Sequence, residues 1–338
     1  MEVGEAVGAS NAIPDLASQL HTARPLRRPC GFFDPECVSK ALFERASETR
    51  GRIPSTGRVF YLSVFAHYGQ GREDLVNSHK IVVVTDSSAY IPEEALGSLH
   101  IPVIPLWVIW GDDRFRDGVD IDPPAFYQRL QTDSVFPTTS QPSAGELLDF
   151  FRQVGAEAEG VVGIFVTSKL SGTVANAQAA EAELTDVKVR VVDSLSTSMA
   201  LGFMVLAAAR AAAAGGSLDQ VVAAAEEMRD RVQLIFVVDT LEYLHRGGRI
   251  GGAKWLLGTA LNIKPLLYLE EGGIEPLAQV RTKRKAVAQM LDTAEEWLGG
   301  RRMAEAAVLH VDNPKEGESV IEQVRDRFGI STVYRLSL

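Results

Sequence analysis

Residues 161–178, "VVGIFVTSKLSGTVANAQ", join a short apolar run rich in β-branched residues to an alanine-rich run typical of a helix. Between the two runs, residues 167–173 carry four hydroxyl side chains and one lysine; we call this segment the serine turn. In open α/β sheets, ligands bind beyond the carboxyl ends of the strands. The stretch therefore predicts an α/β fold with a polar binding site where this strand leads into a helix.

Three more short runs, at residues 81–84, 187–192 and 234–238, are rich in β-branched residues. Such runs predict strands that are covered on both faces, as in a parallel sheet. Each run is followed by Asp, Ser or Thr, including Asp86 and Ser87 after the first. We expect these side chains to support the polar edge of the sheet, although N-capping of helices alone would explain about half of them.

The composition limits the classes of function that this chain can have. With 338 residues, 46% of them apolar, the chain is long enough for two folded domains, and its net charge of -10 argues against a nucleic-acid surface. The longest apolar stretch, residues 199–214, contains Arg210 and predicts a buried helix rather than a membrane span. Cys30 and Cys37 are the only cysteines, which favours a reducing, cytoplasmic setting without a cysteine-bound zinc.

The pattern divides the chain into three parts. Residues 1–79 show no sustained period, which predicts a poorly ordered extension; codons for Glu73 and Asp74 can resemble a ribosome-binding site, so translation is expected to begin at Val76. Residues 80–238 predict a parallel-sheet α/β domain. Residues 239–338 contain a hairpin turn, "EEGG", and predict an α+β domain with an antiparallel sheet.

Two helix starts and one acidic segment are structural signals. Ser143 and Glu146 have the spacing of a capping box, and Asp122 precedes two prolines as a capping carboxylate would. The acidic segment 112–122 contains arginines, which we expect to pair with its carboxylates. Because the ligand spacing of an EF-hand is absent, we predict no metal site.

Ser171 allows two interpretations. As a nucleophile it would define a serine-dependent acyl hydrolase, but the leading glycine of a Gly-x-Ser-x-Gly elbow is missing, and the histidines that follow it are His245 and His310. As a binding group, it would hold an anionic oxygen together with the amides of Gly172 and Thr173 at a helix N-terminus. Both interpretations remain open from the residues alone.

Two further segments suit an anionic ligand. Residues 137–143, "PTTSQPS", form a second hydroxyl-rich segment, the threonine loop, whose Thr139 and Ser140 we expect to face the serine turn. Residues 246–252, "RGGRIGG", form the arginine loop, in which Arg246 and Arg249 supply persistent positive charge. A solvated basic loop is the alternative interpretation of the arginine loop. For the basic cluster "RTKRKA" at residues 281–286, which opens a predicted helix, a solvated face is the favoured interpretation.

Several separated pieces together resemble one family. "KIVVVTDSSAYIP", "PTTSQPSAGEL", "TSKLSGTVANAQ", "VVDSLSTSMALGFMV", "HRGGRIGG" and "VRTKRKAV" occur in the order typical of the DegV family of bacterial fatty-acid-binding proteins, from Lys80 to the last residue. The resemblance implies a two-domain carrier that binds a long-chain fatty acid between its domains. It also implies that a separate ATP-dependent fatty-acid kinase phosphorylates the carboxylate, and that the acyl phosphate goes to phospholipid synthesis.

The resemblance also assigns roles. Thr139 and Ser171 match the family positions that bond the carboxylate, Arg246 and Arg249 match a loop near the head group and the kinase, and residues 86–87 match the first strand end. No catalytic residue, metal or cofactor other than the fatty acid is implied, and transient contact with a membrane acyltransferase is expected. A lipid-sensing regulatory module is the alternative to a carrier.

Two further expectations concern the alkyl tail of the fatty acid and the C-terminal end of the chain. Residues 199–206 and 255–261 are candidates for the tail tunnel, where each buried methylene contributes about 0.8 kcal/mol. Members of the family usually continue past the strand matching "STVYRLSL" into a Gly-x-His-x-Gly-Pro-Gly segment, whereas this sequence stops at Leu338. The missing histidine predicts a carboxylate held more weakly by roughly 1.5–3 kcal/mol.

Overall fold

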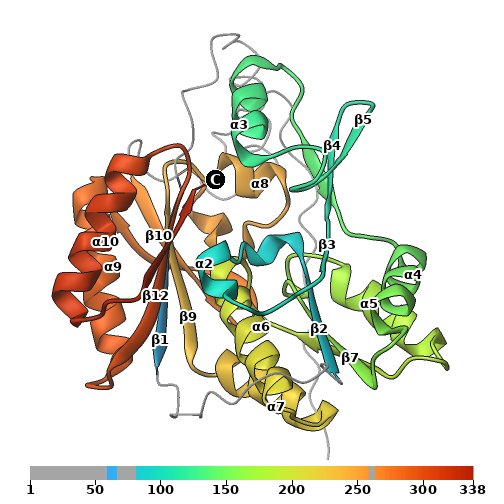
Figure 1. Ribbon diagram of the computed structural model, residues 1–338. Helices are drawn as coiled ribbons and strands as arrows, with labels where there is room; N and C mark the ends of the chain where they lie inside the picture. Colours follow the sequence, from blue (N-terminus) through green and yellow to red (C-terminus); the bar gives the residue numbers. More distant parts are fainter. Residues whose placement is uncertain (1–58, 67–80, 259–262, 338) are drawn as a thin grey trace, which may run out of the picture. The chain divides into compact units, whose positions relative to one another are not determined.

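The computed structural model describes residues 59–66, 81–258 and 263–337 (Figure 1). All of them fall in one unit, Ile53–Leu338, and the other unit, Met1–Arg52, lies outside the described residues. The described strands form three sheets, of six, four and three strands. Apart from 59–66, the predicted extension 1–79 and its proposed start at Val76 lie outside the described residues.

The four-stranded sheet confirms the predicted parallel α/β arrangement. Its strand order is β3-β2-β7-β8, and every neighbouring pair is parallel. Helices α4 and α5 cover one face through an apolar cluster around Phe151 and Phe165, while α6 and α7 cover the other. The elements are β2 (Ile81–Asp86), β3 (Val103–Ile104), α4 (Ala144–Gly155), β7 (Gly160–Phe165), α5 (Thr173–Glu183), β8 (Val189–Asp193), α6 (Ser198–Ala213) and α7 (Leu218–Arg229).

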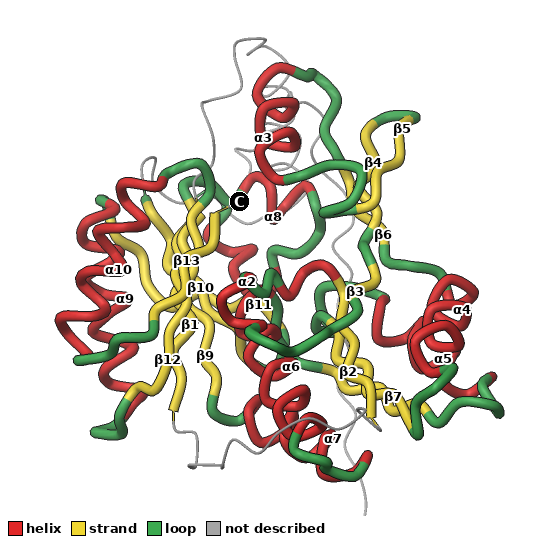
Figure 2. Tube along the Cα trace, viewed as in Figure 1, coloured by secondary structure: helices red, strands yellow, loops and turns green. Residues whose placement is uncertain are grey.

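The six-stranded sheet is mostly antiparallel, in the order β11-β10-β9-β1-β12-β13, with only the pair β12 and β13 parallel among its described pairings. Helices α9 and α10 lie on one face of it (Figure 2). This confirms the predicted second sheet and its "EEGG" hairpin. The elements are β1 (Val59–Ala66), β9 (Val232–Val238), β10 (Lys264–Glu270), β11 (Gly273–Val280), α9 (Lys283–Leu298), β12 (Met303–His310), α10 (Pro314–Phe328) and β13 (Val333–Ser337).

The strand β9 corrects one expectation. Residues 234–238 were expected in the parallel sheet, but β9 pairs antiparallel with β1 and β10 in the six-stranded sheet. Its alternate residues enter two apolar clusters: Leu234 and Phe236 pack with α6, whereas Ile235 and Val237 pack with α9 and α10. Because both faces are covered by helices, the strand is apolar throughout and resembles a parallel strand in its sequence.

The strand β1 lies within the segment for which no ordered element was expected. It pairs antiparallel with β9 on one side and with β12 on the other. Its sequence, "VFYLSVFA", is rich in Val and Phe, which are favoured in strands. This composition was a local signal of a strand within a segment that otherwise lacks periodicity.

The three-stranded sheet, in the order β5-β4-β6, carries the threonine loop. Ser143 and Glu146 form the predicted capping box, and Asp122 accepts a hydrogen bond from the Ala125 amide at 2.8 Å. Arg116 pairs with Asp120 at 2.9 Å, as the acidic segment led us to expect. The remaining elements are η1 (Ser87–Ala89), α2 (Glu93–Leu96), β4 (Trp107–Trp110), β5 (Asp113–Arg116), α3 (Pro123–Thr132), β6 (Thr138–Ser140), α8 (Glu242–Arg246) and η2 (Gly251–Leu256).

The helix α6 is the buried helix predicted from the apolar stretch. Every residue from Met199 to Leu206 is buried, and Phe203 is fully buried. None of the helices in the described ranges is both long and apolar enough to cross a membrane.

Candidate binding site at the carboxyl edge

The serine turn is held together by its own hydrogen bonds. The amides of Leu170 and Ser171 donate to the carbonyl of Thr167, at 3.1 and 3.2 Å. The Ser171 hydroxyl lies 2.9 Å from the Thr173 hydroxyl and accepts a 3.3 Å hydrogen bond from the Thr173 amide. Thr173 is fully buried, whereas Ser171 and Gly172 are half-buried at the first turn of α5. The turn therefore presents Ser171 at a helix N-terminus, where an anion is favoured.

The threonine loop lies directly against the serine turn. The Asn176 side chain of α5 donates a 2.7 Å hydrogen bond to the Pro142 carbonyl. The Gln141 side chain packs on Gly172 so closely that a Cβ there would lie 2.7 Å from its Nε2 atom. Thr139 is exposed and Ser140 is half-buried beside these contacts. The structure thus brings together the two hydroxyl-rich segments that sequence reasoning placed at one edge.

The arginine loop reaches both of these segments. Arg249 donates a 3.0 Å hydrogen bond from Nε to the carbonyl of Leu170, inside the serine turn. Arg246 pairs with Glu242 at 2.5 Å, and its guanidinium lies 5.2 Å from the ring centroid of Phe136, next to the threonine loop. Phe136 in turn stacks on Tyr243 of α8 at 5.7 Å. Both arginines therefore lie beside the hydroxyl-rich segments, although they come from a different part of the chain.

The glycines of the arginine loop allow it to approach the sheet. Gly251 has a φ of +52°, and a Cβ there would overlap the carbonyl oxygen of Ile274 in β11. A Cβ on Gly252 would overlap the carboxylate of Glu275 in the same strand. Residues with side chains rarely adopt this φ and would not fit against β11. The two glycines of "RIGG" therefore allow the backbone to pack closely on β11, while Arg249 of the same pattern hydrogen-bonds to the serine turn.

Asp86 and Ser87 connect neighbouring elements at this edge. The fully buried Asp86 accepts hydrogen bonds from the Ser88 amide at 2.9 Å and from the Val166 amide at 2.8 Å, so it joins the ends of β2 and β7. Burial raises the pKa of its carboxyl above the usual range, while the hydrogen bonds from Ser88 and Val166 oppose that shift. The Ser87 hydroxyl donates to Asp117 at 2.7 Å. Both side chains therefore join elements of the protein to one another, and their predicted role in supporting the site stays a prediction.

Asp193, which follows the run at residues 187–192 and was expected at the polar edge, accepts a 3.2 Å hydrogen bond from the Ser168 amide. Two other polar residues, Gln141 and Asn176, escaped the sequence analysis; they hold the threonine loop on the serine turn. Asn176 lies in the first turn of α5, three residues after Thr173, where its side chain faces the neighbouring loop. The available signal in the sequence was an amide side chain in the first turn of a predicted helix. Its hydrogen-bond partner, the Pro142 carbonyl, becomes known only when the threonine loop is placed beside that helix.

The tail candidates differ in their surroundings. The helix α6 candidate is buried throughout, as a tunnel wall or a core would require. In the second candidate, Leu256 is buried but Trp255 is 62% exposed, so this tryptophan does not line an apolar interior. Residues 259–261 of that candidate lie outside the described residues.

The two histidines that follow Ser171 lie in different environments. His245 is exposed on α8, and His310 is only 1% exposed at the end of β12. The Ser171 hydroxyl pairs with the Thr173 hydroxyl rather than with an imidazole. Within the ranges that the structure describes, no three His, Cys, Asp or Glu side chains are grouped to hold a metal ion.

His310 makes stability depend on pH. Burial is the main cause that lowers the pKa of His310 below its usual value of 6.5, and Arg335 adds to the effect. As the pH falls below 6.5, the unfolded chain binds a proton that the folded chain resists. The free energy of unfolding should therefore fall, by up to about 1.4 kcal/mol per pH unit from this group.

Chemical denaturation between pH 7.5 and 5.5 measures this effect as the difference between the wild-type chain and His310→Gln. We expect the variant to lose stability less steeply on acidification. The exposed His100→Gln is the matched control and should retain the wild-type slope. Parallel slopes for all three proteins would contradict the assignment to His310.

Comparison with known proteins identifies the family. Residues 80–338 match the family described as "Uncharacterised protein, DegV family". The chain belongs to the DegV family. A DegV domain-containing protein of Streptomyces coelicolor is 41% identical over 251 residues, which cover 74% of this chain and 88% of the relative. Protein DegV of Bacillus subtilis is 33% identical over 249 residues, covering 73% and 89%.

Solved structures of DegV proteins share the fold. A fatty-acid-binding DegV family protein from Thermus thermophilus has a TM-score of 0.70 and 36% identity, and the match covers 77% of this chain and 92% of that one. DegV of Bacillus subtilis, described as a fatty acid binding protein, has a TM-score of 0.70 and 32% identity, with coverage of 77% and 93%. These likenesses confirm the family and fold that the separated motifs predicted.

Proposed function

We propose that this DegV protein binds one long-chain fatty acid and holds its carboxylate at the edge formed by the serine turn, the threonine loop and the arginine loop. The observation that carries the proposal is the convergence of these three segments, through the Asn176 bond to Pro142 and the Arg249 bond to Leu170. Family members described as fatty-acid-binding support the class of ligand.

The residues at this edge suit a carboxylate. The hydroxyls of Ser171 and Thr139 would donate to its oxygens, and the amides of Gly172 and Thr173 lie at the positive end of α5. Ser140 and Arg249 would complete the polar surroundings. An alkyl tail would gain about 0.8 kcal/mol for each methylene that enters an apolar interior, for which buried residues of α6 are the candidates.

The carrier role assigns phosphoryl transfer to another protein. A separate ATP-dependent kinase would phosphorylate the bound carboxylate, and the acyl phosphate would then pass to phospholipid synthesis, with transient contact to a membrane acyltransferase. Arg246 has a half-exposed side chain and suits an anionic phosphate near that partner. In this proposal the chain acts in the cytoplasm and needs no cofactor of its own.

The first test is native mass spectrometry of the full chain purified from a bacterial host, followed by denaturing identification of any released molecule. We expect a stoichiometric adduct with the mass of a fatty acid. ATP-dependent phosphorylation of that acid after addition of a fatty-acid kinase would support the carrier, and binding without transfer would support the lipid-sensing module. Hydrolysis of a model ester that requires Ser171 would contradict both in favour of an acyl hydrolase.

Ser171→Ala should weaken fatty-acid binding by roughly tenfold to a hundredfold, because it removes one hydrogen bond to a charged group, worth about 1.5–3 kcal/mol. Ser168→Ala is the matched control within the serine turn, since Ser168 is exposed. Titration calorimetry with oleate measures both. Equal affinities for the two variants would remove Ser171 from the carboxylate site.

A further inference from the structure

The hairpin between β10 and β11 extends from the six-stranded sheet to the serine turn. Its two central residues, Glu271 and Gly272, have φ values of 47° and 82°, the left-handed pair that a tight hairpin turn requires. The Gly272 carbonyl accepts a 3.2 Å hydrogen bond from the hydroxyl of Thr167, which is 105 residues away in the chain and fully buried. The hairpin tip is therefore joined to the end of β7.

This contact is close on both sides. A Cβ on Gly272 would overlap the Thr167 hydroxyl and would lie 3.3 Å from the Cα atom of Leu195. Leu195 and Glu271 have φ values of 49° and 47°, although neither is glycine. Left-handed backbone at residues other than glycine is unfavourable and is concentrated at ligand clamps and switch regions. The fold thus maintains two unfavourable backbone conformations where the tip meets the edge.

Thr167 links the hairpin tip to the backbone of the serine turn. Its carbonyl accepts the amides of Leu170 and Ser171, and its hydroxyl also accepts the Lys169 amide at 3.2 Å. Three of the backbone amides of the serine turn thus depend on this one residue. Fixing the Thr167 side chain fixes the direction in which Ser171 is presented.

The same hairpin also supports the arginine loop. Ile274 and Glu275, which follow the tip in β11, lie against Gly251 and Gly252. Arg249, two residues earlier in the chain than Gly251, donates to the serine turn. One hairpin therefore contacts both the serine turn and the segment that carries the arginine.

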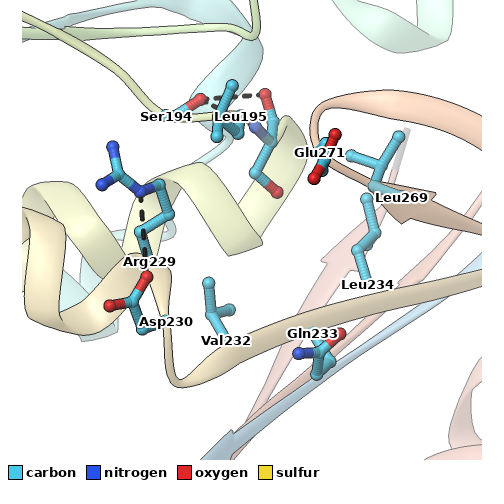
Figure 3. Close-up of a pocket in the computed structure, with 10 residues that line it drawn as sticks. Ser194, Leu195, Arg229, Asp230, Val232, Gln233, Leu234, Leu269 and Glu271 are labelled. Carbon is cyan, nitrogen blue, oxygen red and sulfur yellow. Dashed lines mark hydrogen bonds and ion pairs between the residues drawn. The ribbon is translucent and has the colours of Figure 1, made fainter.

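A hollow of about 220 Å³ lies beside the tip (Figure 3). Glu271 and Leu269 line it from the hairpin, Leu195 from the loop after β8, and Arg229 from the end of α7. The tip is thus fixed against Thr167 but has open space next to Glu271.

We propose that the β10–β11 hairpin tip is a latch, in which Gly272 and Thr167 are positioning residues that hold the serine turn in its carboxylate-binding geometry. The proposal rests on the proposed function, because it assigns the latch to a carboxylate. When the latch is closed, Ser171 faces the ligand; when the tip withdraws, the serine turn loses the bond that orients Thr167 and releases the head group.

The test measures the affinities of cis-parinaric acid, a fluorescent long-chain fatty acid, and of its methyl ester. The ester has the same tail but no carboxylate, so the affinity ratio of acid to ester reports the head-group geometry and is insensitive to a general loss of stability. Thr167→Val removes the hydroxyl and keeps the side-chain shape. We expect it to lower the ratio by about tenfold, which corresponds to about 1.4 kcal/mol.

Further variants complete the experiment. Gly272→Ala should lower the ratio at least as much as Thr167→Val, and Thr167→Ser should restore it. Gly300→Ala is the matched control, because Gly300 has the same φ of 82° but its added methyl group would have no atom of the described residues within 4 Å. The ratio for this control should equal that of the wild type.

The outcomes separate the latch from the function on which it rests. A wild-type chain that prefers the acid, together with a Thr167→Val ratio equal to that of Gly300→Ala, would overturn the latch alone. A wild-type chain that binds neither probe would overturn the proposed function and the latch with it. Thermal denaturation of each variant checks that it is folded, and Thr167→Val keeps the test decisive if Gly272→Ala does not fold.

Discussion

Gly251→Ala should lower the free energy of unfolding by about 3 kcal/mol and should also weaken fatty-acid binding. Alanine costs about 1–2 kcal/mol at the φ of +52°, and its Cβ would overlap the carbonyl oxygen of Ile274, which adds an overpacking term of similar size. Because Ile274 contributes backbone rather than a flexible side chain, η2 must move away from β11. Arg249 would then lose its bond to the serine turn.

Gly329→Ala provides the matched control for this prediction. Gly329, which follows α10, has a φ of +63°, so alanine is strained there too, but among the described residues no atom lies within 4 Å of its added methyl group. We expect a loss of only about 1 kcal/mol and an unchanged affinity for oleate. Urea denaturation and titration calorimetry of both variants measure the two effects. Similar losses in stability and affinity would show that the contact with β11 does not position the arginine loop.

The sequence predicted the local features of this fold well. The capping box at Ser143, the capping carboxylate of Asp122 and the "EEGG" hairpin each depend on a few neighbouring residues, and all are present. Short-range signals of this kind reflect hydrogen bonds and backbone preferences that form within one turn. They are therefore visible without knowledge of the rest of the chain.

The sheet membership of β9 could not be predicted in the same way. An apolar strand that is covered by helices on both faces has the same composition in a parallel and in an antiparallel sheet. Leu234 and Ile235 face different apolar clusters, but their sequence does not say which helices form those clusters. Only the pairing with β1 and β10, which are distant in sequence, decides the sheet.

The candidate site shows the same division. Ser171 was predicted as a binding group because a hydroxyl at a strand-to-helix turn suits an anion, Thr139 because the family resemblance implies it, and Arg249 because its loop is basic. Gln141 and Asn176 were missed because their role is to join two segments, and a residue that joins segments has no signal until its partner is known. The Thr167 contact with Gly272 spans 105 residues and was invisible for the same reason.

Phe203→Ala should have the largest effect on stability, a loss of about 3–5 kcal/mol in the free energy of unfolding. Phe203 is fully buried in α6, and its ring centroid lies 5.8 Å from that of Tyr334 in β13, so it packs α6 against the six-stranded sheet. Such a loss is a large share of the usual stability of a domain, about 5–15 kcal/mol. The half-buried Phe150→Ala is the control and should lose less.

The Phe203→Ala variant also decides whether α6 forms a wall of the tunnel that holds the fatty-acid tail. Removing the phenyl group leaves a cavity, and a cavity open to the tail would be filled by a longer alkyl chain, at about 0.8 kcal/mol for each methylene buried. If α6 is a tunnel wall, the bound acids identified by mass spectrometry should shift to longer tails, and an added long-chain acid should recover part of the lost stability. If Phe203 belongs to the core alone, the stability falls but the distribution of chain lengths stays that of the wild type, because the new cavity is then closed to the ligand.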